Sequence, residues 1–169
     1  MDWTHLHLAL NHVPVLGTPF LLGLLLWSWA RRQAATLRLC LWLFVVLAAA
    51  SIAIKFTGDF AAEKVGSATG FDKALIDRHE ESADQATTGV FFMGVAAALA
   101  LYLSRLGRAT PNWSLGLLSL LALATCALMV RTANFGGHIR HPEIRPGAPV
   151  AETDKTRFLV YLSRTAQFG

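Results

Sequence analysis

Four long apolar runs, separated by short charged segments, constrain this chain more than any other feature. The runs cover approximately residues 13–30, 37–56, 87–106 and 113–130. Each is close to the ~20 residues that a helix needs to cross the hydrocarbon core of a bilayer. Backbone groups in lipid must form hydrogen bonds within their own segment, so helices are the expected structure. The sequence therefore predicts an all-α integral membrane protein.

The composition supports a lipid bilayer as the main partner. Apolar residues make up 54% of the 169 residues and charged residues only 15%, whereas soluble domains average roughly 25% charged residues. The formal net charge of +4 is concentrated in two short segments between apolar runs, where basic residues set membrane orientation. We therefore expect no nucleic-acid partner.

The distribution of arginines predicts which side of the membrane each loop occupies. Arg31, Arg32 and Arg38 lie at the junction of the first two runs, and Arg105 and Arg108 at the junction of the last two, with no acidic residue in either segment. Short loops rich in Lys and Arg stay in the cytoplasm. We expect a protein of the bacterial inner membrane with both termini and the central segment in the periplasm.

Short loops make consecutive helices antiparallel neighbours, which predicts an up-down-up-down four-helix bundle. We expect a loop over residues 57–70, and a third helix that begins near residue 71 and extends beyond the membrane. Gly136 and Gly137 are expected to end the fourth helix. Residues 1–141 would then form the transmembrane bundle and 142–169 an extramembrane tail. Small residues are expected at the helix seams, among them Gly17, Gly23, Gly89, Gly94, Gly116, Ala48–Ala50, Ala96–Ala98 and Ala122.

All the histidines fall on one side of this topology. The chain has six: His5, His7, His12, His79, His138 and His141. Ionisable groups beside an apolar core are functional candidates, although ordinary interfacial residues satisfied by water remain an alternative. His79-Glu80 lacks the second histidine of a zinc-protease helix, because Ala83 stands at that position.

Two cofactor chemistries fit these residues. A haem b needs two imidazoles on facing helices and an apolar slot, and Arg140 and Arg145 are candidates for its propionates. Aromatic candidates for the slot walls are Trp3, Phe71, Phe91, Phe92 and Phe135. Zinc, copper or non-haem iron is the alternative, with ligands drawn from His12, His79, His138, His141 and Glu80.

The spacing His7-x4-His12-x-Pro14, with His79 before the third membrane run and Gly136-Gly137-His138 after the fourth, resembles a family of uncharacterised small bacterial four-helix membrane proteins. That family in turn is similar to membrane-embedded b-type cytochromes. The resemblance covers residues 5–141 and implies His7, His12, His79 and His138 as haem-ligand candidates. Leu8 departs from the pattern, because the family often has Pro there. The cytoplasmic half of the bundle has no histidine, so a second haem there is not supported.

The sequence thus predicts a membrane-bound haem b protein that carries electrons at the periplasmic face, rather than a hydrolase. Its partner would be a redox subunit or a periplasmic electron carrier, and an oligomer is left open. Two alternatives remain: a non-haem metal-binding membrane protein using His and Glu, and a cofactor-free structural subunit of a membrane complex.

Overall fold

A computed structural model describes residues 3–66, 72–105, 109–145 and 147. Across these residues the chain is helical and contains no strand, which confirms the all-α prediction. The helices are α1 (Trp3–Leu10), α2 (His12–Ala30), α3 (Ala34–Gly66), α4 (Lys73–Arg105) and α5 (Asn112–Arg140), followed by a short 3-10 turn, Pro142–Ile144.

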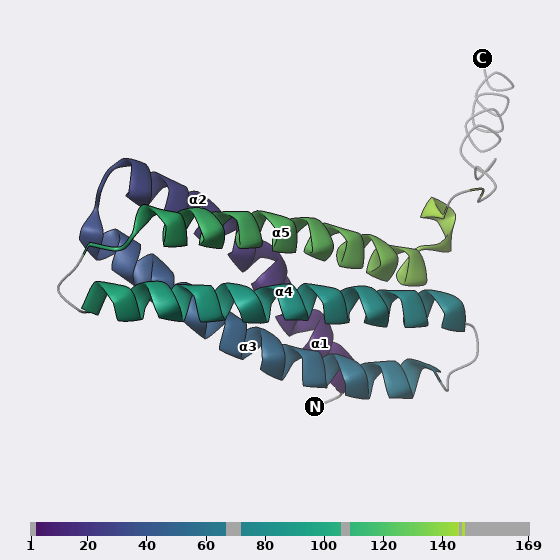
Figure 1. Cartoon of the computed structure of the whole chain (residues 1–169). Helices are drawn as coiled ribbons and strands as arrows, with labels where there is room; N and C mark the ends of the chain where they lie inside the picture. Colours follow the sequence, from purple (N-terminus) through teal and green to yellow (C-terminus); the bar gives the residue numbers. More distant parts are fainter. Residues whose placement is uncertain (1–2, 67–71, 106–108, 146, 148–169) are drawn as a thin grey trace, which may run out of the picture.

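Four helices surround a common core (Figure 1). Helix α2 packs against α3, α3 against α4, α4 against α5, and α5 against α2. The end of α2 and the start of α3 lie at the same end of the molecule as the end of α4 and the start of α5. We call this the arginine end, after Arg31, Arg32, Arg38 and Arg105. The opposite end is the histidine end, after His7, His79 and His138.

The short helix α1 continues the line of α2 but leaves the ring of four. It packs on α3 and touches α2, and none of its Cα atoms comes within 8 Å of α4 or α5. Pro14 has no N–H and its ring would clash with the carbonyl of Leu10, so a continuous helix cannot pass this point undistorted. The helix breaks at Asn11, which separates α1 from α2. The sequence reading did not predict α1.

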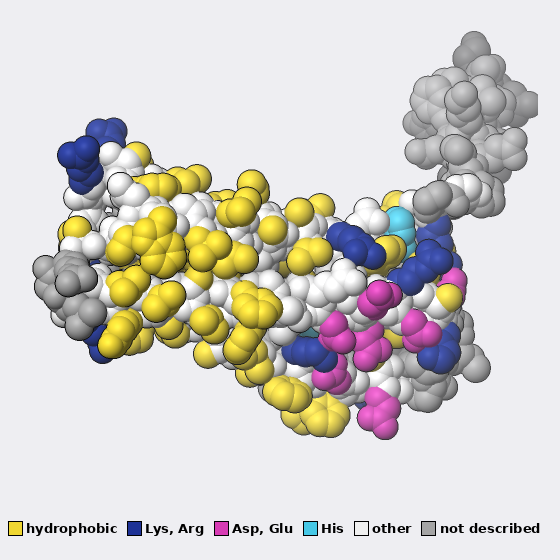
Figure 2. All heavy atoms as spheres, viewed as in Figure 1, with side chains coloured by type: hydrophobic (Ala, Val, Ile, Leu, Met, Phe, Trp, Pro, Cys, Tyr) yellow, Lys and Arg dark blue, Asp and Glu magenta, His cyan; other side chains and the backbone are white. Residues whose placement is uncertain are grey.

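The helical segments Trp3–Ala30, Ala34–Lys64, Lys73–Arg105 and Asn112–Arg140 are long and apolar enough to cross a membrane. Many of their large apolar side chains point outward: Phe20 is 68% exposed and Leu120 64%. Figure 2 shows these side chains covering the surface from the arginine end to beyond the middle of the bundle, and charged side chains gathering at the histidine end. Such a belt matches what a lipid-facing surface requires.

Small residues allow the helices to approach closely. A Cβ on Gly94 would overlap Ala48 of α3, and a Cβ on Gly17 would lie 3.1 Å from the Leu47 side chain. These positions confirm the predicted use of small residues at helix seams. Gly23 is an exception, because a Cβ there meets nothing within 4 Å.

Two predicted boundaries are wrong. Residues 57–66 belong to α3 rather than to a loop, and α5 runs through Gly136 and Gly137 to Arg140. In both cases glycine had been interpreted as a breaker. Gly58 and Gly136 instead sit inside helices against a side chain of a neighbouring helix, where the absence of a Cβ allows the contact.

The expected extension of the third membrane helix is confirmed as a helical segment. Helix α4 begins at Lys73, close to the predicted start, and runs continuously into the apolar run. The Asp72 carboxylate accepts a hydrogen bond from the Ala74 N–H at 3.0 Å and so caps the first turn. Most of the predicted tail, including residues 148–169, lies outside the described residues.

Candidate functional site

The candidate site lies at the histidine end, where His7 of α1 faces helix α3. Its Nδ1 is 3.2 Å from the Thr57 hydroxyl oxygen. That hydroxyl donates its proton to the Ile54 carbonyl at 2.6 Å, so it can only accept from the ring. The proton of a neutral His7 ring therefore sits on Nδ1, and its Nε2 carries a free lone pair.

His79 of α4 repeats this arrangement against α5. Its Nδ1 is 3.0 Å from the Thr132 carbonyl oxygen. A carbonyl can only accept, so Nδ1 is the protonated nitrogen and Nε2 again carries the lone pair. No hydrogen bond to the Nε2 of His7 or His79 is found among the residues the structure describes. Both rings are half-buried.

A glycine supports each of the two rings. A Cβ on Gly58 would lie 2.8 Å from His7 Cε1, and a Cβ on Gly136 would lie 3.2 Å from His79 Cε1. Any side chain at position 58 would push the His7 ring from its place. Each histidine therefore contacts two residues of one neighbouring helix: a threonine oxygen that accepts its hydrogen bond, and a glycine that leaves room for its ring. That helix is α3 for His7 and α5 for His79.

Hydroxyl groups link α4 and α5 beneath His79. Ser82 is fully buried, and its hydroxyl lies 2.9 Å from that of Thr132. The Thr132 hydroxyl donates to the Leu128 carbonyl at 3.0 Å, so Ser82 must donate to Thr132. The carbonyl of the same Thr132 receives the His79 proton. This network fixes the α4–α5 contact at the depth of the imidazole.

Charged side chains form a ring between this cluster and the apolar belt. Lys55 makes ion pairs with Asp59 and Asp84, each at 3.0 Å. Arg131 donates to the Gln85 amide oxygen at 3.0 Å. These contacts connect α3 to α4 and α4 to α5. The boundary between the charged and apolar surfaces therefore lies at the same height along the bundle on α3, α4 and α5.

The other predicted cofactor ligands are placed differently. His12 is exposed, and its Nδ1 bonds the Leu8 carbonyl of the preceding turn at 3.1 Å. His138 is half-buried on α5, where its carbonyl accepts from Arg145 Nε at 2.8 Å. Arg140 is exposed. The structure therefore brings His7 and His79 to comparable half-buried positions and leaves His12 on the surface.

The residues proposed for a bare metal ion are dispersed. His141 pairs with Glu143 at 2.9 Å, and both side chains are exposed. The pKa of Glu143 is lowered by its own backbone N–H and then by His141. Glu80 lines a cavity of about 310 Å³ between α3 and α4, together with Asp59, Glu63, Lys73 and Asp77. In the described parts of the chain, no group of three or more His, Cys, Asp or Glu is arranged to hold a metal ion.

The aromatic candidates are also divided. Trp3 packs on Phe60 with ring centroids 5.1 Å apart, beside the helix pair that holds His7. Phe135 lies under the Arg131 guanidinium, 5.6 Å from it. Phe91 and Phe92 pack edge to face and are about half exposed. Phe71 lies outside the described residues.

The sequence reading missed the residues that hold the two rings, namely Thr57, Gly58, Thr132 and Gly136. A usable signal existed for the first pair. Lys55, Asp59 and Glu63 recur at intervals of four, which is the spacing of one helix face. That spacing argues for a helix across residues 55–63, with Gly58 inside it.

Comparison with known proteins identifies no matching family model, no significantly similar curated protein and no significantly similar solved structure.

Proposed function

We propose that this chain is a haem-b-binding membrane protein in which His7 and His79 are the axial ligands and electrons pass at the histidine end. One observation carries the proposal. Two half-buried imidazoles on different helices each donate Nδ1–H to an acceptor and leave Nε2 without a hydrogen-bond partner among the described residues. Histidines that bind metals characteristically hold their second nitrogen in this way.

The number of ligands favours haem over a bare ion. Protein zinc sites use three or four side-chain ligands, and the described residues bring no three such groups together. A porphyrin supplies four nitrogens itself and needs only axial ligands from the protein. Two imidazoles therefore satisfy a haem but are insufficient for a structural zinc ion.

The separation of α1 from α4 and α5 is also consistent with a haem between the two histidines. A ring held between two imidazoles needs the helices that carry them to stand apart, and α1 comes within 8 Å of neither α4 nor α5. Asn11, one helical turn beyond His7, has a buried Oδ1 with no partner in the described part of the chain. Such an orphaned oxygen is unusual, and a cofactor on the His7 face of α1 would account for it.

The chain's own residues have distinct tasks in this proposal. Thr57 and the Thr132 carbonyl fix which nitrogen of each ring is free, and Gly58 and Gly136 leave room for the rings. Arg145, already fixed by its bond to the His138 carbonyl, and the exposed Arg140 are the propionate candidates. When bound, the haem would supply reversible one-electron chemistry.

The length of the apolar belt supports a membrane placement. Arg38 and Lys55 are 17 residues apart on α3, and Asp84 and Arg105 are 21 apart on α4. At ~1.5 Å per residue these spans are about 25 and 32 Å, against a hydrocarbon core of about 30 Å. In this placement the helices insert up-down-up-down into the bacterial inner membrane, both termini are periplasmic, and His7 and His79 lie at the periplasmic interface. A redox subunit or a periplasmic electron carrier would reach them there.

An absorption spectrum of the purified protein, expressed with haem available, tests the proposal. We expect a six-coordinate low-spin haem spectrum. His7→Ala and His79→Ala should each remove the haem or open a coordination position and change its spin state. His141→Ala is the matched control, because His141 is an exposed histidine at the same end and should leave the spectrum unchanged.

Two results would decide against the proposal. Absence of haem absorption in the unaltered protein rejects haem, and metal analysis of the same sample then tests the non-haem alternative against a structural role. A spectrum that survives His7→Ala but is lost in His12→Ala would show that the axial assignment is wrong.

A further inference from the structure

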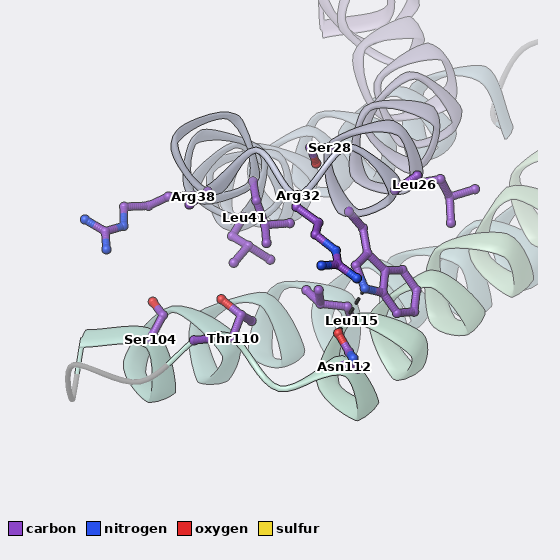
Figure 3. A pocket seen from close by; sticks show the side chains of 14 residues that line it. Leu26, Ser28, Arg32, Arg38, Leu41, Ser104, Thr110, Asn112 and Leu115 are labelled. Carbon is purple, nitrogen blue, oxygen red and sulfur yellow. Dashed lines mark hydrogen bonds between the residues drawn. The ribbon is translucent and has the colours of Figure 1, made fainter.

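A second candidate site lies at the arginine end, away from all histidines. A cavity of about 780 Å³ opens among the last turn of α2, the start of α3, the end of α4 and the start of α5. Figure 3 shows Arg32 pointing into this space toward Asn112 and Leu115, whereas Arg38 points away at its edge. Arg32 follows the last turn of α2 with a positive φ of 53°, a backbone conformation uncommon outside glycine and asparagine.

The charge around this cavity is uncompensated. The sequence has no Asp or Glu between residues 3 and 58, or between 85 and 142. The segments that line the cavity, within residues 26–41 and 104–115, therefore carry no acidic side chain. Neither the Arg32 nor the Arg38 guanidinium forms an ion pair or a hydrogen bond with another described residue. Two guanidinium groups at an opening with no anion of the protein's own favour an anionic ligand.

The lining is apolar on one side and polar on the other. Leu26, which is 46% exposed, and the half-buried Leu37 supply apolar surface, and Ser104, Thr110 and Asn112 supply polar groups. Leu41 and Leu115 also border the cavity but are each only 1% exposed. The Trp29 indole N–H donates a hydrogen bond to the side-chain amide oxygen of Asn112 at 3.0 Å. This contact orients the Asn112 amide and leaves its NH₂ group as a donor. A free inorganic anion would use the polar side and leave the apolar surface of Leu26 and Leu37 uncovered.

We propose that this cavity binds an anionic phospholipid of the leaflet at the arginine end. The phosphate binds at Arg32, with Arg38 at the rim and the Asn112 amide as a further donor, and an acyl chain lies along Leu26 and Leu37. Basic pockets between membrane helices bind anionic headgroups in this way. The inference rests on the membrane placement proposed above but is independent of haem.

Lipid retention measured by native mass spectrometry tests this proposal. The full-length protein, extracted in mild detergent, is titrated with phosphatidylglycerol and separately with phosphatidylcholine. We expect preferential retention of phosphatidylglycerol and roughly fivefold weaker binding in Arg32→Gln, since one basic residue near a charged headgroup contributes about that factor. Arg31→Gln is the matched control, because Arg31 is the adjacent arginine and does not line the cavity.

Three outcomes would overturn the proposal. Equal retention of both lipids removes the charge argument. Equal loss in Arg31→Gln and Arg32→Gln indicates a general surface charge effect rather than this cavity. Displacement of phosphatidylglycerol by millimolar inorganic phosphate would indicate a phosphate site without a lipid. The haem spectrum of Arg32→Gln, measured on the same sample, separates failure here from failure of the haem proposal, and extraction without detergent would contradict the membrane placement.

Discussion

The two ends of the bundle handle charge in opposite ways. At the histidine end, cations and anions alternate and pair, as in the contacts of Lys55 with Asp59 and Asp84. At the arginine end, Arg31, Arg32, Arg38 and Arg105 occur without a single acid. Arg105 lies over the Trp42 ring, 5.5 Å from it, and so contacts an aromatic face instead of a carboxylate.

This difference shows what each end needs from its surroundings. Several charges at the histidine end are paired within the protein, and under the haem proposal its two half-buried imidazoles bind the cofactor. The segments at the arginine end carry no acidic side chain, and under the lipid proposal an anion from outside the chain compensates their charge. The same asymmetry is what the positive-inside rule uses to orient a membrane protein.

The largest expected difference between the two ends is their position on opposite sides of a membrane, which cysteine labelling can test. In a background with Cys40→Ala and Cys126→Ala, we expect Ala34→Cys to react with an impermeant maleimide only from the cytoplasm. Glu63→Cys should react only from the periplasm. Labelling in intact cells and in inverted vesicles measures this all-or-none difference. Reaction of both positions from one side would remove the proposed topology.

A glycine series sharpens the role of the histidine end. Gly58→Ala should weaken haem binding most, because its Cβ would meet His7 Cε1 at 2.8 Å and turn the ring away. Gly136→Ala should have a smaller effect, since the corresponding distance to His79 is 3.2 Å. Gly23→Ala is the control, with open space beside it. Haem titrations of the three proteins give the order, and a different order would contradict the ring placement.

The two threonines allow a finer test. Thr57→Val removes the acceptor of the His7 proton and should weaken haem binding by about tenfold, the lower part of the range for loss of an orienting bond. Thr132→Val should weaken it less, because His79 bonds the backbone carbonyl of Thr132 and that group remains. Its main effect should be lower thermal stability, since the buried Ser82 hydroxyl loses its acceptor. Affinity measured by haem titration compares them. Equal losses would show that hydroxyl packing, and not ring orientation, explains the effect.

The smallest expected effect concerns the charged ring itself. Asp84→Asn removes one of the two partners of Lys55, whose side chain is 31% exposed while that of Asp84 is 54% exposed. Exposed ion pairs contribute about 0.2–1 kcal/mol, so thermal unfolding in detergent should shift slightly and less at high salt. A large loss of stability would mean that this pair is less accessible to solvent than its exposure indicates.

The sequence predicted the parts of the fold that follow from composition. Long apolar runs fix helices in lipid, and the all-helical chain follows from them. Residues 57–66 do not form the predicted loop. A glycine such as Gly58 looks the same in the sequence whether it ends a helix or lies inside one where a side chain of another helix packs closely. Only the position of His7, 51 residues earlier, distinguishes the two cases. Long-range contacts of this kind leave no local pattern.

For the candidate site, the sequence likewise predicted the residue types but not their contacts. His7 and His79 were among the histidines named from the sequence, but nothing in their spacing separated them from His12. The distinction comes from burial and from the place of the Nδ1 acceptor, which lies on a neighbouring helix for His7 and His79 and in the preceding turn for His12. Both properties depend on how the helices pack: α1 on α3 for His7, and α4 on α5 for His79. Thr132 acts through its backbone carbonyl, which no residue type reveals.

The break at Asn11 has a consequence for how the protein matures. Helix α1 is made first, yet Thr57 is 50 residues later and His79 is 72 residues after His7. Contacts this distant in the chain form late, after the intervening segments have been arranged. A haem that required both imidazoles would be retained only once both hairpins had docked and α1 had settled on α3. Acquisition of the cofactor would then act as a checkpoint for completed assembly.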